Sequence, residues 1–289
     1  MRKFRYLAVT SALLIALASP AGADPNIEQI GTVAVPDGPA PTWIIADLDT
    51  GQVLAGSDMY ATHPAASTIK TLLALTVLDE LDLDSTVVAD SAAVRTECSC
   101  AGIEAGESYT VRELLDAALL VSGNDAANTL ATALGGFDAA VEKMNAKAAS
   151  IGATETHVTS PSGLDGPDGP GWTSPHDLAV IFRAAMAKPV FAEIVATPRA
   201  PFPGPDGPHE LVNQDELLVR YPGAIGGKTG FTDEARKTFV GAADRDGRRL
   251  VIAMMYGLIH EGGPTYWDQA EALLDWGFSQ DRSEQIATL

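Results

Sequence analysis

The chain has 289 residues, of which 46% are hydrophobic and 20% are charged, and its formal net charge at pH 7 is −19. This composition is that of a globular protein and not of a disordered one, and the length suffices for one large domain or two small ones. The acidic balance argues against a nucleic-acid partner, although net charge says nothing about the fold.

Residues 1–23 have the pattern of an export signal. Arg2, Lys3 and Arg5 form a positive start, residues 7–18 form an apolar run, and residues 21–23 form a small-residue cleavage site. The run is too short to span a bilayer comfortably, which favours cleavage over anchoring. Losing three basic and no acidic residues would change the net charge from −19 to −22. We therefore expect an exported chain with no transmembrane anchor.

The first predicted elements are a β-hairpin over residues 43–55 and a helix over residues 71–78. The helical segment is apolar nearly all round, as expected inside a domain. Ser67 and Lys70 precede it on one face, because positions i and i+3 are neighbours in a helix. Burial lowers the proton affinity of a lysine, which can then activate a serine hydroxyl. On its own, however, this spacing is more often a capping serine followed by an exposed lysine.

Residues 83–109 are predicted to be surface segments because glycines and polar residues interrupt any pattern. They contain Cys98 and Cys100, the only two cysteines. A ring closed across one residue removes little chain entropy, so a small local disulfide and two free thiols are both compatible with the sequence. Neither these cysteines nor the five histidines have the spacing of metal ligands, and no metal or cofactor is expected.

The middle of the chain is predicted to be helical. Thr110 and Glu113 form a capping box before a helix that ends at Val121. Asp125 can cap the next helix, and Ser174 a later one with proline at its first position. The predicted helices cover about residues 110–121, 125–134, 137–151 and 174–188, and irregular loops are predicted over residues 161–171 and 198–208.

The C-terminal third changes to period-two patterns. Residues 224–231, 238–243 and 250–256 are predicted strands, the last two joined by a turn at Asp246-Gly247, and residues 266–276 a closing helix. With the early hairpin, the sequence predicts an α/β (α+β) fold. Its antiparallel sheet has about five strands from both ends of the chain, and its helices come mostly from the middle.

Three short motifs carry a resemblance to a known family. They are Ser67-Thr68-Ile69-Lys70, Ser122-Gly123-Asn124 and Lys228-Thr229-Gly230, in this order along the chain. The set resembles the signature of the penicillin-recognising serine enzymes, above all the low-molecular-mass penicillin-binding proteins that act as serine D-alanyl-D-alanine carboxypeptidases. The similarity covers about residues 40–280 and includes residues 64–66, 221–223, 231–235 and 274–278.

This resemblance implies a β-lactamase/transpeptidase-like fold. Residues 24–289 would form one peptidase domain, with a sheet subdomain over residues 40–85 and 195–289 and an inserted all-helical subdomain over about 86–194. The implied function is removal of the terminal D-alanine from peptidoglycan stem pentapeptides in the wall space of a bacterium. Penicillins and other β-lactams would be covalent inhibitors.

The resemblance also implies roles for single residues. Ser67 would form an acyl-enzyme, with Lys70 as general base and Ser122 as proton relay to the leaving amine. The backbone N–H groups of Ser67 and Phe231 would hold the oxyanion, and Lys228 with Thr229 the terminal carboxylate. The implied substrate-binding residues are Asn124, Lys228, Thr229, Gly230 and Phe231. Gly227 and Gly230 would let the substrate lie against the strand.

Other functions are less compatible with the sequence. A class A β-lactamase uses a deacylating Glu-x-x-x-Asn loop after the second motif, whereas Glu210 and Asn213 have the wrong spacing. A non-catalytic penicillin sensor would usually have a membrane helix, and a nucleotide-binding loop would need glycine at Pro222. Many relatives have an arginine before the last helix; residues 262–267 contain none, although His260 is close. Carboxypeptidase, endopeptidase and transpeptidase activities share the motif residues.

Overall fold

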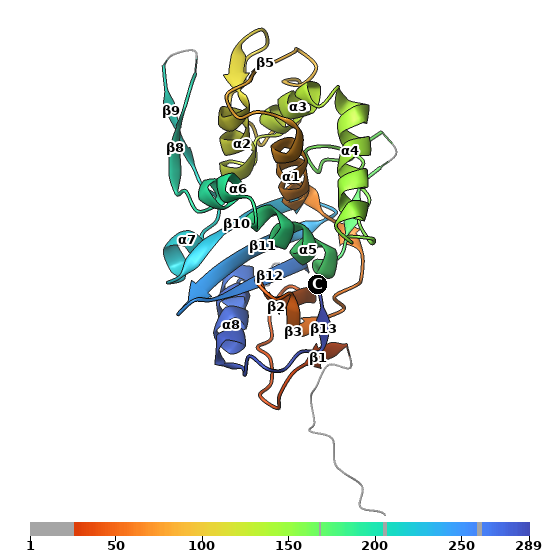
Figure 1. Ribbon diagram of the computed structural model, residues 1–289, viewed down its shortest axis with the longest axis vertical. Coiled ribbons are helices and arrows are strands. Elements are labelled where there is room, and N and C mark those ends of the chain that lie inside the picture. The colour runs from red at the N-terminus through yellow and green to blue at the C-terminus, as the bar shows by residue number, and fades with distance from the viewer. Residues whose placement is uncertain (1–25, 168, 205–206, 259–261) are drawn as a thin grey trace, which may run out of the picture.

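The computed structural model describes residues 26–167, 169–204, 207–258 and 262–289. The predicted export signal and His260 lie outside these residues. Figure 1 shows a central sheet with helices on both faces and a larger group of helices beyond one face. No helix in the described part of the chain is long and apolar enough to cross a membrane.

Within the described residues the sheet has seven strands, which pair antiparallel in the order β1-β3-β2-β12-β11-β10, with β13 also paired to β3. The five predicted strands are confirmed. Two more, β1 and β13, lie along the outer edge of β3 and are too short to show a period-two pattern. The strands are β1 (Ile27–Gln29), β2 (Thr42–Asp47), β3 (Gln52–Ser57), β10 (Ala224–Thr232), β11 (Arg236–Arg245), β12 (Arg248–Gly257) and β13 (Ala287–Thr288).

Successive side chains of a strand point to opposite faces, and here both faces are buried. Ile44 of β2 belongs to the hydrophobic core under the helices, whereas Ile45 belongs to a second core under α8 (Tyr266–Ser279). A Cβ on Gly277 of α8 would lie 2.4 Å from the Ile45 side chain, so this glycine permits the close approach of α8 to the sheet. On the other face, α5 (Pro175–Met186) packs against β12 and β2.

Helix α1 (Lys70–Glu80) lies at the centre of the helical side, as its apolar sequence predicts. All residues from Lys70 to Val77 are buried, and α1 contacts α2, α4 and α5. The capping box at Thr110 and the Ser174 cap of α5 are both confirmed. The remaining helices are α2 (Val111–Leu120), α3 (Asn124–Ala133), α4 (Phe137–Ser150), α6 (Pro189–Val195) and α7 (Leu217–Arg220). The division into a sheet subdomain and a helical subdomain stays a prediction.

Two segments that we predicted to be irregular contain short strand pairs. The predicted loop over residues 198–208 begins with β8 (Arg199–Phe202), which pairs with β9 (His209–Val212). A two-stranded pair has free edges, so Pro201 is tolerated there despite its missing N–H. Likewise, β5 (Thr86–Val88) pairs with β6 (Ser108–Thr110) near the two ends of the predicted surface segments over residues 83–109. A third pair, β4 (His63–Pro64) with β7 (Trp172–Thr173), lies outside these two segments. Phe202 of β8 is buried and stacks on Tyr109, which attaches the hairpin to the helical side.

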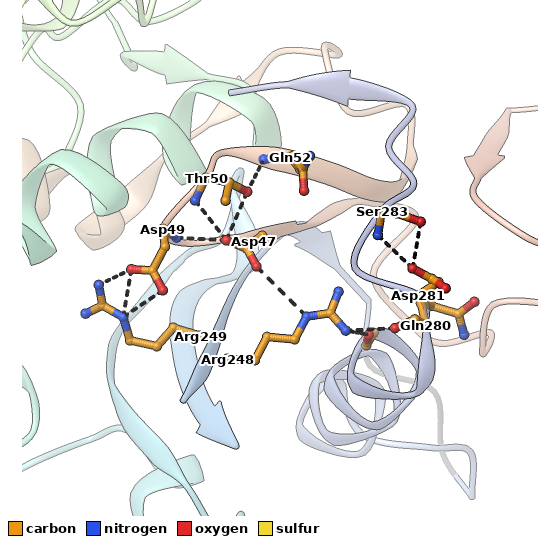
Figure 2. A network of polar contacts seen from close by, with 10 residues as sticks. Asp47, Asp49, Thr50, Gln52, Arg248, Arg249, Gln280, Asp281 and Ser283 are labelled. Carbon is orange, nitrogen blue, oxygen red and sulfur yellow. Dashed lines mark hydrogen bonds and ion pairs between the residues drawn. The ribbon is translucent and has the colours of Figure 1, made fainter. Parts of the chain in front are cut away.

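Figure 2 shows the polar network that joins the start of β12 to the end of α8. The guanidinium of Arg248 is buried, and its Nη1 donates to the carbonyl oxygens of Gly277 at 3.1 Å and Gln280 at 2.9 Å. Its Nε lies 3.9 Å from the Asp47 carboxylate of β2. The last carbonyls of a helix have no partner within the helix and favour a cation. Arg248 therefore fastens α8 to the sheet.

We expect replacement of Arg248 by methionine to lower the free energy of unfolding by about 2 kcal/mol, because two buried carbonyl oxygens lose a charged donor. Urea unfolding followed by circular dichroism measures this change. The matched control is Arg249→Met, which removes an exposed ion pair with Asp49 and should cost less than about 1 kcal/mol. Equal losses in the two variants would show that Arg248 has no special role.

Candidate active site

A cavity of about 850 Å³ opens where β10, the 3₁₀ turn η1 (Ala66–Ile69) and the start of α3 meet. All three sequence motifs reach this place. The two lysines of the motifs do not line the cavity; Lys70 and Lys228 are 0% and 1% exposed and lie behind its wall. The predicted residues that do line it are Ser67, Ser122, Asn124, Thr229, Gly230 and Phe231.

Ser67 is positioned by a strained backbone turn. It lies in η1, three residues before Lys70, the first residue of α1, and the preceding Ala66 has a φ of 47°, in the left-handed region. Such a conformation persists only where neighbours hold it. A Cβ on Gly163 would lie 2.0 Å from the Ala66 carbonyl oxygen, so the loop can pack against this turn only with glycine there. The hydroxyl of Thr238 also donates to the carbonyl oxygen of Ala65 at 3.0 Å.

The amine of Lys70 lies among three oxygens. Its Nζ is 2.8 Å from Ser67 Oγ, 2.7 Å from Asn124 Oδ1 and 2.7 Å from the carbonyl oxygen of Ser162. Burial, and next the charge of Lys228, hold the pKa of Lys70 well below its usual value, while Asp125 opposes the shift. An unprotonated Lys70 has two N–H groups for the two carbonyl oxygens and one lone pair for the serine hydroxyl. The geometry therefore suits a base acting on Ser67.

The second lysine is held beneath the Ser122 hydroxyl. Lys228 Nζ donates to Ser122 Oγ at 3.0 Å and to the carbonyl oxygen of Thr229 at 2.8 Å. Burial lowers the pKa of Lys228 to about 7, and the charge of Asp215 opposes this shift. Burial raises the pKa of Asp215 to about 7, although the hydrogen bond from the Leu217 N–H and the charge of Lys228 both oppose this rise. The Lys228 ammonium and the Asp215 carboxylate therefore each stabilise the charged form of the other.

Asn124 links Lys70 to the loop at the cavity rim. Its Nδ2 donates to the Glu97 carbonyl oxygen at 2.7 Å, and its backbone N–H donates to the Ser99 carbonyl oxygen at 2.8 Å. Cys98 and Cys100 of this loop form a disulfide, which decides between the two alternatives that the sequence left open. The bonded loop therefore faces the cavity and contacts the side chain that holds Lys70.

We predicted that Asp125 caps α3, and this prediction is wrong. Gly123 occupies the N-cap position, and the buried Asp125 carboxylate accepts hydrogen bonds from the backbone N–H groups of Ala101, Gly102 and Ile103 at 2.9–3.0 Å. Its sequence position fits a cap, but three loop donors lie within reach of its side chain. Asp125 thereby fixes the rim loop beside Asn124.

The glycines of β10 permit close packing within the protein, and their predicted role in substrate binding stays a prediction. A Cβ on Gly227 would lie 2.7 Å from the Phe239 ring, and one on Gly230 would lie 2.3 Å from Thr238 Oγ1 and 3.0 Å from Ser67 N. These glycines therefore allow β10 to pack against β11 and η1. They bring the strand edge to Ser67.

Some site groups could not be recognised in the sequence. The carbonyl oxygens of Glu97 and Ser162 are backbone atoms that every residue type has. Asp215 and Lys237 belong to no motif, although Lys237 lines the cavity. Glu210, the nearest candidate for a deacylating glutamate, instead pairs with Arg199 at 2.5 Å on the β8–β9 hairpin and does not line the cavity.

Comparisons with known proteins agree with this geometry. A family model described as D-alanyl-D-alanine carboxypeptidase, Peptidase_S11, matches residues 30–257. D-alanyl-D-alanine carboxypeptidase DacB2 of Mycobacterium tuberculosis is 67% identical over 267 residues, which cover 92% of each chain. A crystal structure of D-alanyl-D-alanine carboxypeptidase from M. tuberculosis H37Rv has 67% identity and a TM-score of 0.89, covering 91% of this chain and 99% of that one. The Streptomyces K15 DD-transpeptidase has 28% identity and a TM-score of 0.78, covering 86% of this chain and 100% of that one. The predicted transpeptidase-like fold is confirmed.

Proposed function

We propose a mechanism from the premise that this chain belongs to the D-alanyl-D-alanine carboxypeptidase family and is a serine hydrolase. The proposed substrate is a peptidoglycan stem pentapeptide, which loses its terminal D-alanine. The observation that carries the mechanism is the 2.8 Å distance between Lys70 Nζ and Ser67 Oγ beside the cavity, with an amine whose pKa is lowered.

Acylation begins with transfer of the hydroxyl proton of Ser67 to the unprotonated Lys70. The Asn124 side chain and the Ser162 carbonyl hold the other two N–H groups of the amine, so its lone pair is directed at the serine. Ser67 Oγ then attacks the carbonyl carbon of the penultimate D-alanine. The negative oxygen that forms is stabilised by the backbone N–H groups of Ser67 and Phe231.

Departure of the terminal D-alanine requires a proton on its amine nitrogen. Ser122 supplies this proton from the cavity wall, and the Lys228 ammonium, which donates to Ser122 Oγ, leaves the serine proton free to face the leaving group. Lys70 returns a proton to Ser122. Water then attacks the ester, with Lys70 again as base, and releases the shortened peptide. A β-lactam carbonyl takes the place of the peptide carbonyl in the same first step.

We also propose that the chain is exported and acts in the wall space of a bacterium. The pattern of residues 1–23 supports export, and the proposed substrate is a wall component. Carboxypeptidase, endopeptidase and transpeptidase reactions share the acyl-enzyme and differ in the acceptor and the leaving group. The family match favours the carboxypeptidase.

The test uses the native chain with a muropeptide pentapeptide and with benzylpenicillin. We expect mass spectrometry to detect one released D-alanine for each peptide, and a long-lived penicillin adduct on the proteolytic fragment that contains Ser67. An adduct without D-alanine release would favour a penicillin sensor. Fast turnover of nitrocefin would favour a β-lactamase, and either result would contradict the proposal.

A further inference from the structure

The cavity presents a charge problem for the proposed substrate, which ends in a carboxylate. The net charge of the chain is −19, and Lys228, the cation that the family resemblance assigns to this carboxylate, is buried and donates to Ser122 and to a backbone carbonyl. In the described part of the chain, five carboxylate side chains line the cavity, namely Glu97, Asp165, Glu216, Asp233 and Glu234. An anionic peptide end therefore needs a cation that faces the cavity.

Among the described residues, Lys237 is the only lysine, arginine or histidine that lines the cavity. It lies on β11 directly opposite Phe231 of β10. Directly opposed residues of an antiparallel pair project to the same face, and so do residues two apart on one strand. Lys237, Phe231 and Thr229 therefore share one face at the strand edge that approaches Ser67.

The surroundings of Lys237 hold its ammonium group without neutralising it. Nζ lies 5.5 Å from the ring centroid of Phe231 and 5.7 Å from that of Tyr266. Aromatic faces attract a cation, and they also restrict the lysine chain. Among the described residues, no carboxylate forms an ion pair with Lys237, whereas Lys143, Lys147 and Lys188 all have one. Its charge remains available to a ligand.

We propose that Lys237 binds the terminal carboxylate of the substrate and determines the preference for peptides with a free C-terminus. This inference rests on the proposed function. The terminal carboxylate is only one residue, about 3.8 Å in Cα spacing, beyond the carbonyl that Ser67 attacks. With that carbonyl oxygen at the Phe231 N–H, the carboxylate lies beside the face that carries Thr229 and Lys237. Lys237 thus supplies the cation that residues 262–267 lack.

The test compares two peptides, acetyl-Lys-D-Ala-D-Ala with a free carboxylate and the same peptide with a terminal amide. Release of D-alanine or D-alaninamide is followed by mass. We expect Lys237→Met to lower kcat/KM for the acid about 10-fold to 100-fold and to affect the amide much less, so that the acid-to-amide ratio falls at least about tenfold. Methionine keeps the packing between Phe231 and Tyr266, and Lys237→Arg should restore most of the ratio.

Two comparison variants separate this role from others. Lys143→Met removes the same charge from an exposed ion pair on α4 and should leave the ratio unchanged. Lys228→Met should lower kcat/KM for both peptides alike, because Lys228 contacts Ser122 and not the cavity. An unchanged ratio in Lys237→Met, or a fall in Lys228→Met alone, would overturn the inference while leaving the proposed hydrolase intact. If the native chain released neither product, the proposed function itself would fail.

Discussion

Replacement of Ser67 by alanine is expected to abolish labelling by fluorescent penicillin and to lower D-alanine release at least about a thousandfold. The reason is that Ser67 Oγ lines the cavity and contacts Lys70, whose pKa is held well below its usual value. Lys70 keeps its contacts with Asn124 and Ser162 in this variant, so the fold and the cavity should persist. Gel fluorescence and intact-protein mass measure the labelling.

Ser122→Ala is the matched control, because it removes the other cavity hydroxyl that contacts a lysine. It should slow labelling and still yield the adduct, since Ser67 remains the atom that forms the ester. Thermal unfolding of both variants verifies that they are folded. Stoichiometric labelling of Ser67→Ala would identify another nucleophile and end the present assignment.

Replacement of Lys70 by methionine is expected to reduce the second-order rate constant of penicillin acylation about 100-fold to 10,000-fold, the range for loss of a general base. In the native chain, only the unprotonated amine can accept the serine proton. As the pH falls through the lowered pKa of Lys70, the amine gains a proton and the acylation rate should fall. As the pH rises again, the rate should recover. Stopped-flow measurements across pH reveal this acidic limb.

The acidic limb should be missing in Lys70→Met, because the group that titrates has been removed. Lys143→Met, which removes an exposed lysine far from Ser67 in the chain, should keep both the rate and the limb. A Lys70→Met variant with a native pH profile would show that another group accepts the proton. The obvious alternative is Lys228, whose pKa is also lowered, to about 7.

The sequence predicts the fold best where hydrophobic periodicity and local turn chemistry agree. The three C-terminal strands follow from period-two patterns, and Asp246 and Gly247 do form the turn between β11 and β12. By contrast, β1 and β13 have three and two residues, and they form only because β3 offers them an edge. Such pairing depends on residues distant in the sequence, which a local pattern does not contain.

The same contrast between local patterns and distant contacts explains which residues of the site could be predicted. Ser67, Lys70 and Asn124 were predicted because three motifs occur together in an order that resembles a known family, whereas the spacing of Ser67 and Lys70 alone is not specific. The carbonyl oxygens that direct Lys70 and Asn124 have no residue-type signal, and Asp125 was assigned to a cap because its tertiary donors come from residues 101–103. Lys237 could be placed only from the register between β10 and β11.

The order of the sheet also separates the cavity from both ends of the described chain. β1 and β13 lie end to end along β3, and β10 forms the opposite edge, five strand spacings or about 24 Å away. A fluorophore, an affinity handle or a linker to a solid support attached beside Ile27 or Thr288 would therefore sit on the edge remote from Ser67. Sensors for β-lactams could be built on this protein by tethering it there, with the mouth of the reactive cleft turned toward the sample.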